Sequence, residues 1–346
     1  MDLEKLLSFN NLVIDKNEEE KEKLANIFNI DYEEYKKRIA GKEKEADFII
    51  ILKSLGVLKH FEAYDESLSH ITKEYTPDFK IEMCDGYKML IEVKHTDKDI
   101  FEISQGNLAK RKAFADRENL PLRFAVSLKG LWGLFPVETL IEKKGKLKLQ
   151  DFIGEKTGSL LDIELATCSY MFKKQVKIRS VYAKNHNKGM GIQFEPYGQL
   201  ISYELYYGDR KIFRAKGKKS KFILYSMYLE AIQNRAANHE QIKEEKGNFT
   251  VITEYTDERD VQIIPEYEFV LSPIKHMYKD IDSKQIKYNS QIVIAEREFK
   301  YLSIQNLRAI LYELVSMGLD IIVFRNSYGY KFMDYAKQYW TKTSNQ

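Results

Sequence analysis

The stretch that decides the fold is Tyr75–His95, which reads YTPDFKIEMCDGYKMLIEVKH. It holds two extended runs, Tyr75–Met83 and Lys88–His95, and the four residues Cys84-Asp85-Gly86-Tyr87 separate them. Asp-Gly between two alternating runs is a strong β-hairpin signal, because glycine adopts the positive φ that a tight turn needs. We therefore expect two adjacent antiparallel strands.

The flanking segments extend this hairpin into a larger α/β unit. Upstream, Lys42–Leu55 has a helical apolar pattern and Gly56 stands where a helix would end. Downstream, Ile103–Arg117 is predicted to be a helix with Ser104 as its N-cap, and Leu120–Leu128 and Leu131–Val137 are predicted strands. The order helix, hairpin, helix, strand predicts an α/β core in which helices flank both faces of a mixed sheet.

The chain is long enough for more than one domain. Residues 1–40 read as short charged helices and are predicted to form a helical appendage. Residues 41–155 hold the α/β core, and residues 156–346 are predicted to form a C-terminal α+β domain for nucleic-acid binding or assembly. That last region includes an extended run at Val261–Leu271 and a helix at Ile304–Met317, with Ser303 as its cap.

Four charged residues of the core are of the types that phosphodiester hydrolysis uses. Asp78 begins one hairpin strand and Glu92 and Lys94 lie on the other, while Glu45 lies on the first helix. Strand periodicity puts Glu92 and Lys94 on one face, and the tight turn can bring Asp78 close to them. Hydrolysis needs a hard divalent cation held by oxygen ligands, an activated water and neutralisation of the charge that grows on phosphate. We therefore expect a catalytic site here.

The same residues carry a family resemblance. Glu45, Pro77-Asp78 and Glu92-Val93-Lys94 stand in the order of the PD-(D/E)XK pattern, and the chain resembles this nuclease superfamily over residues 41–150. The superfamily includes restriction endonucleases and archaeal-type Holliday-junction resolvases, and the spacing from Glu45 to Gly56 resembles the resolvase branch. The fold that the resemblance implies is a restriction-endonuclease-like core.

The resemblance also implies roles for these residues. Asp78 and Glu92 would ligate Mg²⁺, or Mn²⁺ as its substitute, with help from the backbone carbonyl of Val93. Lys94 would serve the nucleophile, and Glu45 would support the metal directly or through water. Glu43 and Asp47 flank Glu45, and either would replace it if the helix register differs.

Two sets of residues are predicted to contact nucleic acid. The superfamily often places a polar helix after the lysine strand, and Gln105, Lys110 and Arg111 fall on the helix predicted there. Residues 141–225 carry 18 lysine and arginine residues against 8 acidic ones, a net charge of +10 within a chain of net charge +3. Such a segment is either a phosphate-binding surface or a solvated one. Its densest cluster, which we predict to grip phosphate, comprises Arg210, Lys211, Arg214, Lys216, Lys218, Lys219 and Lys221.

Composition indicates the expected cellular location of the protein. The longest strongly apolar stretch, Phe48–Leu52, is too short to span a bilayer, and the N-terminus lacks the layout of a signal peptide. With only Cys84 and Cys168, the chain has no disulfide framework, so the cytoplasm is the expected location. We expect no membrane partner.

The function expected from these features is Mg²⁺-dependent DNA endonuclease activity of a restriction, resolvase or phage-defence (antiviral) type. Three alternatives stay open: an RNA nuclease, an exonuclease on the same core, and a nucleic-acid-binding relative that does not cleave. Cutting both strands of a duplex with one site per chain favours a homodimer, and the chain could also be one protein of a larger system.

Overall fold

The structure of this protein is a computed structural model. Clustering of contacts divides the chain into two units: residues 1–53 with 57–165, and residues 54–56 with 166–346. The three-part division predicted from the sequence stays a prediction. The structure describes residues 3–13, 16–64, 75–152, 158–184, 193–194, 197–216, 225, 227–237, 240–256, 262–275, 277–280, 285–288, 292–294, 303–325 and 328–331.

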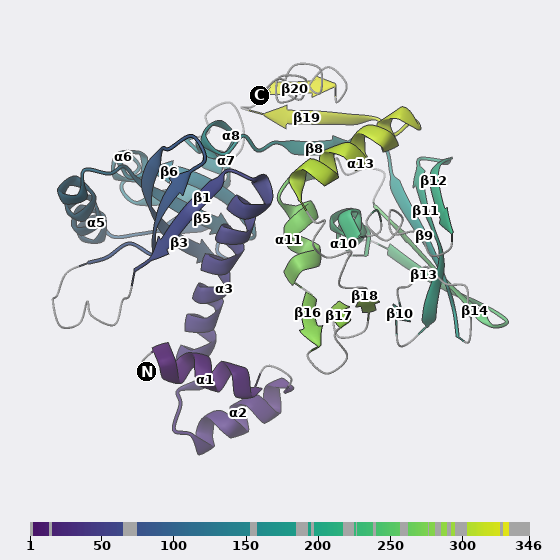
Figure 1. Cartoon of the computed structure of the whole chain (residues 1–346), viewed down its shortest axis with the longest axis horizontal. Helices are drawn as coiled ribbons and strands as arrows, with labels where there is room; N and C mark the ends of the chain where they lie inside the picture. The colour runs from purple at the N-terminus through teal and green to yellow at the C-terminus, as the bar shows by residue number, and fades with distance from the viewer. Residues whose placement is uncertain are drawn as a thin grey trace. The chain divides into compact units, whose positions relative to one another are not determined.

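The first unit is built on a five-stranded sheet with the strand order β1-β2-β3-β5-β6 (Figure 1). Strands β3 and β5 are parallel and the other neighbours are antiparallel, so the sheet is mixed, as predicted. A small second sheet pairs β4 with β7. The elements of this unit are α1 (Leu3–Val13), α2 (Glu18–Ile27), α3 (Tyr32–Leu55), β1 (Leu58–Ala63), β2 (Phe79–Met83), β3 (Lys88–Thr96), β4 (Ile100–Glu102), α5 (Gln105–Glu118), β5 (Leu122–Leu128), β6 (Leu131–Pro136), α6 (Val137–Glu142), β7 (Lys146–Lys148), α7 (Leu149–Phe152) and α8 (Leu161–Glu164).

The predicted hairpin is confirmed, although its first strand begins at Phe79 rather than at Tyr75. Strands β2 and β3 pair antiparallel, and the turn between them contains Gly86 at φ +87°. The side chain of Asp85 accepts a hydrogen bond from the backbone nitrogen of Tyr87 at 2.9 Å, which closes the turn locally. Such short-range turn chemistry explains why the sequence alone was enough to find this feature.

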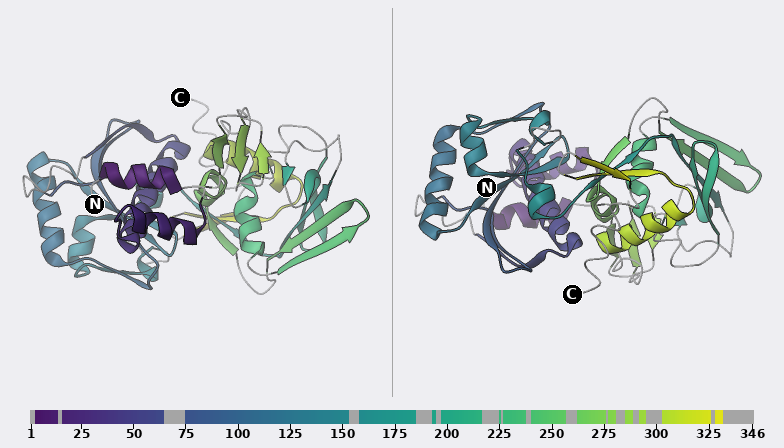
Figure 2. Two further views of the ribbon diagram at one scale, coloured as in Figure 1. Left: turned by 90° about the horizontal axis from the view of Figure 1, so that it is seen from below. Right: turned by 90° about the horizontal axis from the view of Figure 1, so that it is seen from above.

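Helices cover both faces of the five-stranded sheet, as predicted (Figures 1 and 2). On one face Leu108 of α5 packs in a buried apolar cluster with Leu90 and Phe124. On the other face Phe48 of α3 packs against Trp132 of β6, with ring centroids 5.5 Å apart. These two layers fix the sheet between α3 and α5, the helices that border the candidate site.

Of two predictions for the helices of this unit, one is confirmed and one is wrong. Ser104 is the N-cap of α5 and accepts a hydrogen bond from the Asn107 nitrogen, which confirms the predicted cap. The sequence predicts short helices up to residue 40 and a separate helix over Lys42–Leu55, but α3 runs without interruption from Tyr32 to Leu55. A single glycine inside a helix costs only about 1 kcal/mol, and the packing of both halves of α3 outweighs it. The first half contributes Tyr35 to a small core shared with α1 and α2.

The second unit contains a nine-stranded sheet of order β13-β14-β9-β11-β10-β18-β17-β16, with β12 also paired to β11, and a four-stranded sheet of order β15-β8-β19-β20. Helix α10 packs on β9, β13 and β14. The elements are β8 (Ser169–Phe172), β9 (Val176–Ala183), β10 (Gln193–Phe194), β11 (Gly198–Tyr207), β12 (Arg210–Lys216), α10 (Glu230–Ala237), β13 (Glu240–Lys246), β14 (Phe249–Tyr255), β15 (Gln262–Pro265), α11 (Glu268–Lys275), β16 (Met277–Asp280), β17 (Gln285–Tyr288), β18 (Ile292–Ile294), α13 (Ile304–Ser316), β19 (Ile321–Arg325) and β20 (Tyr328–Lys331).

The long helix expected in this unit is confirmed, and the extended run is confirmed only in part. Helix α13 begins after the N-cap Ser303 and is followed by Gly318 at φ +110°. The extended run expected at Val261–Leu271 is wrong beyond Pro265, because Glu268–Lys275 forms α11. The apolar residues there pack as a helix, and a short apolar run does not distinguish the two structures.

No helix in the described ranges combines the length and apolar composition needed to cross a membrane.

Candidate active site

The end of the hairpin brings two carboxylates together in a buried place. Phe79 pairs with Ile91 across β2 and β3, so Asp78, one residue earlier, lies beside Glu92. Oδ2 of Asp78 accepts a hydrogen bond from the backbone nitrogen of Val93 at 2.6 Å. The residue exposure is 7% for Asp78 and 1% for Glu92. Two buried carboxylates this close create a strong demand for positive charge.

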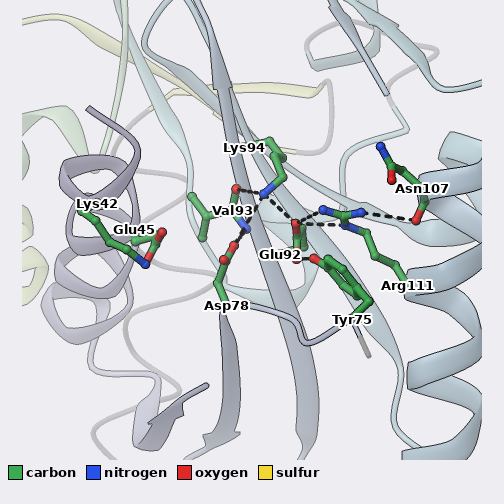
Figure 3. Close-up of polar contacts among 9 residues, drawn as sticks. All are labelled: Lys42, Glu45, Tyr75, Asp78, Glu92, Val93, Lys94, Asn107 and Arg111. Atoms are coloured by element: carbon green, nitrogen blue, oxygen red, sulfur yellow. Dashed lines mark hydrogen bonds and ion pairs between the residues drawn. The ribbon is translucent and has the colours of Figure 1, made fainter. Parts of the chain in front are cut away.

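The ammonium of Lys94 meets that demand in part (Figure 3). Its Nζ lies 2.5 Å from Oε1 of Glu92 and 3.9 Å from Oδ2 of Asp78. It also donates a hydrogen bond to the carbonyl oxygen of Val93 at 2.9 Å. Three oxygens from three different groups therefore surround one cationic centre.

Glu92 is held from its other side by an arginine and a tyrosine. Nε and Nη2 of Arg111, on α5, donate to Oε1 of Glu92 at 2.9 and 2.8 Å. The hydroxyl of Tyr75 donates to Oε2 of Glu92, and the guanidinium of Arg111 lies 3.8 Å from the centroid of the Tyr75 ring. Arg111 also donates to the carbonyl of Asn107, one turn earlier on α5, at 3.3 Å. These contacts fix the position of the Glu92 carboxylate.

Burial and the charges of the cluster raise the pKa values of Asp78, Lys94 and Tyr75. Burial, and next the charge of Glu92, raise the pKa of Asp78 to about 8, against the opposing effect of Lys94. Burial lowers the pKa of Lys94, but the Glu92 and Asp78 carboxylates outweigh it and the net shift is upward. Burial and the nearby Glu92 also raise the pKa of Tyr75, so its hydroxyl keeps its proton. The cluster thus has a protonatable carboxyl next to a fully charged ammonium.

Glu45 borders the site from α3. Its charge contributes to the raised pKa of Asp78, and its Oε2 lies 2.9 Å from Nζ of Lys42. In Figure 3 its carboxylate lies on the side of α3 that faces Asp78 and Val93. Of the two alternatives to Glu45, Asp47 is buried beside Lys44 and Glu43 is exposed. Neither is among the groups that shift the pKa of Asp78.

The donor set suits a hard divalent cation. Within the part of the chain that the structure describes, no three His, Cys, Asp or Glu residues gather as ligands. Asp78, Glu92 and the Val93 carbonyl form a smaller all-oxygen set, and Mg²⁺ is commonly bound by one or two carboxylates and several waters. In the structure the Lys94 ammonium lies among these oxygens.

The residues predicted to contact nucleic acid fall in three different places. Gln105 and Lys110 are exposed on α5, whereas the Arg111 side chain is 11% exposed and bound to Glu92. Arg210, Lys211, Arg214 and Lys216 lie on β12. Lys218, Lys219 and Lys221 lie outside the described residues.

Sequence reasoning missed Tyr75 entirely and did not predict that Arg111 binds Glu92. Tyr75 stands three residues before Asp78 and belongs to no motif, so nothing in the sequence marks its contact with Glu92. Arg111 carries a signal that could have been used: it lies one helical turn from the apolar Leu108, on the side of α5 that packs on the sheet.

Comparison with known proteins adds little to this geometry. No family profile matches the sequence, and a search of curated proteins finds no match. Among solved structures, the chain is similar to a Holliday junction resolvase from Archaeoglobus fulgidus, an archaeal hyperthermophile. The identity is 21% with a TM-score of 0.27, and the match covers 31% of this chain and 86% of the resolvase. A similarity at this level does not bear on the activity of the present chain.

Proposed function

We propose that this protein is a metal-dependent nuclease of the PD-(D/E)XK type that hydrolyses phosphodiester bonds in DNA. The observation that carries the proposal is the convergence of the Asp78 carboxylate, the Glu92 carboxylate and the Val93 carbonyl on the ammonium of Lys94. Hydrolysis of a phosphodiester requires these same elements: oxygen ligands for a divalent cation and a positive group beside the attacking water.

In this proposal each side chain has a separate task. Asp78, Glu92 and the Val93 carbonyl hold Mg²⁺, with Mn²⁺ as a substitute, and Glu45 supports them from α3. The bound cation would supply charge neutralisation on the phosphate and lower the pKa of a water molecule. Lys94 orients the attacking water and stabilises the charge that develops on phosphate. Arg111 and Tyr75 act as positioning residues, because they contact Glu92.

The test is nicking of supercoiled plasmid DNA with Mg²⁺ and with EDTA. We expect cleavage by the wild type only with the metal, and loss of cleavage in Asp78→Asn. Glu82→Gln is the matched control, because Glu82 lies on the same hairpin, bound to Lys59 and Lys88 and away from the cluster. Wild-type cleavage by Asp78→Asn would overturn the assignment.

Parallel substrates separate the finer alternatives. Linear duplex, branched DNA, single-stranded DNA and RNA distinguish restriction-type, resolvase-type, exonucleolytic and RNA-directed activity. A wild-type protein that binds these substrates and cleaves none of them with Mg²⁺ or Mn²⁺ would be a non-cleaving relative, and the hydrolytic proposal would be wrong.

A further inference from the structure

The nine-stranded sheet of the second unit presents a positively charged face. In the pairing of β11 with its neighbours, Glu204 lies opposite Arg179 on one side and Arg214 on the other, and Tyr206 lies opposite Lys177 and Lys211. Lys216 lies opposite Ser202 in the same register. Residues directly opposite one another share a face of the sheet, so the following five cations lie on one side, which we call the cationic face: Lys177, Arg179, Lys211, Arg214 and Lys216.

Glu204 organises this face from its centre. Its side chain is 1% exposed, and its two carboxylate oxygens lie 2.8 Å from Nε of Arg214 and 3.3 Å from both Nη1 of Arg179 and Nζ of Lys211. Burial opposes ionisation of Glu204, but hydrogen bonds from Tyr206, Lys211 and Arg179 outweigh it and lower its pKa. Among the residues of β9, β11 and β12, all of which are described, Glu204 is the one acidic side chain on this face. Glu244 of β13 shares this side of the sheet by register, but its carboxylate is paired with Lys246, so the five cations still outnumber the acidic side chains.

Tyr206 lies between Lys177 and Lys211 on the cationic face. Its hydroxyl donates to Oε2 of Glu204 at 2.8 Å. Nζ of Lys177, from β9, lies 5.7 Å from the ring centroid, and Nζ of Lys211, from β12, lies 5.3 Å from it. An ammonium from each neighbouring strand lies over the ring, so an unpaired base that stacked on it would have to displace a lysine. The face offers charge without a base-reading group.

The opposite face of the same sheet is a core. Buried Ile178, Tyr203 and Ile252 lie on the alternate positions of β9, β11 and β14, and α10 packs on β9, β13 and β14. Arg210 belongs with that opposite side, because it pairs with Tyr207 and its guanidinium lies beside Gly318. The strand register thus separates Arg210 from Lys211, although the sequence places them in one cluster.

We propose that the cationic face is a binding surface for the phosphate backbone of duplex DNA. Cations from β9 and β12 flank β11, and strands in a sheet lie about 4.8 Å apart, so the array is about 10 Å wide. A duplex presents one charge per about 1.7 Å of axis, so several phosphates can meet the array at once. Such contacts position a duplex without reading its sequence. The choice of DNA rests on the proposed nuclease function, whereas the choice of a phosphate backbone rests on the charges alone.

The test measures binding of a short fluorescent DNA duplex to the full chain in EDTA, which keeps cleavage silent. Lys177→Gln with Lys216→Gln is the test variant, because neither lysine is bound to Glu204. Loss of two phosphate contacts should lower the slope of log K against log salt by about 2 and weaken binding about 10-fold or more at about 0.1 M salt. The loss should be the same for duplexes of different sequence.

The matched control removes the same charge from the other side of the sheet. Arg210→Gln with Lys243→Gln serves, because Arg210 pairs with Tyr207 and Lys243 with the buried Ile252. We expect this control to bind as the wild type does. Equal weakening in both double variants would mean that net charge alone matters, and wild-type binding by the test variant would mean a solvated surface. Either result overturns the proposal, as would tighter binding of RNA or single strands than of duplex.

The binding test of the cationic face and the cleavage test of the nuclease proposal can fail separately. A slope change in the test variant alone, in a protein that cleaves nothing with Mg²⁺, supports the surface and refutes the activity. Metal-dependent cleavage with unchanged binding in the test variant supports the activity and refutes the surface.

Discussion

Two glutamates in this protein have almost the same surroundings and, on our account, opposite consequences. Glu92 in the first unit and Glu204 in the second lie on sheet strands, are each 1% exposed and accept a hydrogen bond from a tyrosine hydroxyl. Each is also bound by basic side chains, which are Lys94 and Arg111 for Glu92 and Arg179, Lys211 and Arg214 for Glu204.

The difference is what else lies within reach. Beside Glu92 stand a second buried carboxylate, Asp78, and the carbonyl of Val93, so two carboxylates and a carbonyl share the two cations Lys94 and Arg111. Around Glu204 the cations exceed the one carboxylate. A buried glutamate with basic partners therefore does not by itself indicate a metal site. The number of oxygen ligands relative to basic side chains distinguishes a place that suits a divalent cation from one that suits a phosphate.

The largest effect expected is the loss of cleavage in Glu92→Gln. If Glu92 holds the metal, its loss should lower the cleavage rate on the order of 1000-fold, in the range seen when a group that stabilises the transition state is removed. Plasmid nicking with Glu82→Gln as the control measures it. If Glu92 only held basic side chains in place, as Glu204 does, Glu92→Gln would lower the melting temperature and leave the cleavage rate unchanged.

The next effect concerns the pH dependence of stability without metal. The pKa of Asp78 is raised from 3.8 to about 8, so between these values the folded protein holds a proton that the unfolded chain has released. Stability should therefore fall as the pH rises through that window. Asp78→Asn lacks this titration and should melt several degrees above the wild type near pH 8 in EDTA. Parallel melting curves of the two proteins from pH 5 to pH 8 would contradict the assignment.

A smaller loss of cleavage is expected when Tyr75, which donates a hydrogen bond to Glu92, is replaced. Tyr75→Phe removes a hydrogen bond from Glu92 and leaves the ring stacked on Arg111, so cleavage should fall about 10-fold or more through poorer metal binding. Raising the Mg²⁺ concentration should recover part of the rate, which a purely structural defect would not allow. Tyr87→Phe is the control, because Tyr87 contacts Arg123 outside the cluster. Equal rates for both variants at low Mg²⁺ would remove Tyr75 from the site.

The smallest effect belongs to Glu45→Gln. Its charge adds to the raised pKa of Asp78, so the variant should lower that pKa, and the loss of metal-free stability should be smaller and complete at a lower pH. Cleavage should drop only a few-fold if Glu45 supports the metal through water. A rate loss as large as that of Glu92→Gln would instead make Glu45 a direct ligand.

The parts of the fold that the sequence predicted are those set by local chemistry. The Asp85-Gly86 turn, the Ser104 cap and the Ser303 cap all depend on residues within a few positions of one another. The wrong predictions concern segments whose secondary structure depends on tertiary packing. Helix α3 continues through Gly41, and the residues after Pro265 become a helix, because both choices depend on what the side chains meet in the folded core.

The site shows the same division. Asp78, Glu92 and Lys94 could be predicted together because a short hairpin and strand periodicity bring them close. The contact of Arg111 with Glu92 depends on α5 packing on the sheet, and the contact of Tyr75 with Glu92 depends on how the chain enters β2, so neither follows from the hairpin alone. The cationic face depends on the register of three strands, including an irregularity between Leu205 and Tyr206 that places Lys211 and Arg214 on one side.

Titration calorimetry of Mn²⁺ or Mg²⁺ tests most directly whether Asp78 and Glu92 hold a metal. We predict saturable binding to the wild type, and a repeat in buffers of different ionisation heat should show proton release near neutral pH, because the pKa of Asp78 is about 8. Asp78→Asn should bind the metal far more weakly and release no proton. Equal binding by the wild type and Asp78→Asn, or no binding by either, would contradict the account.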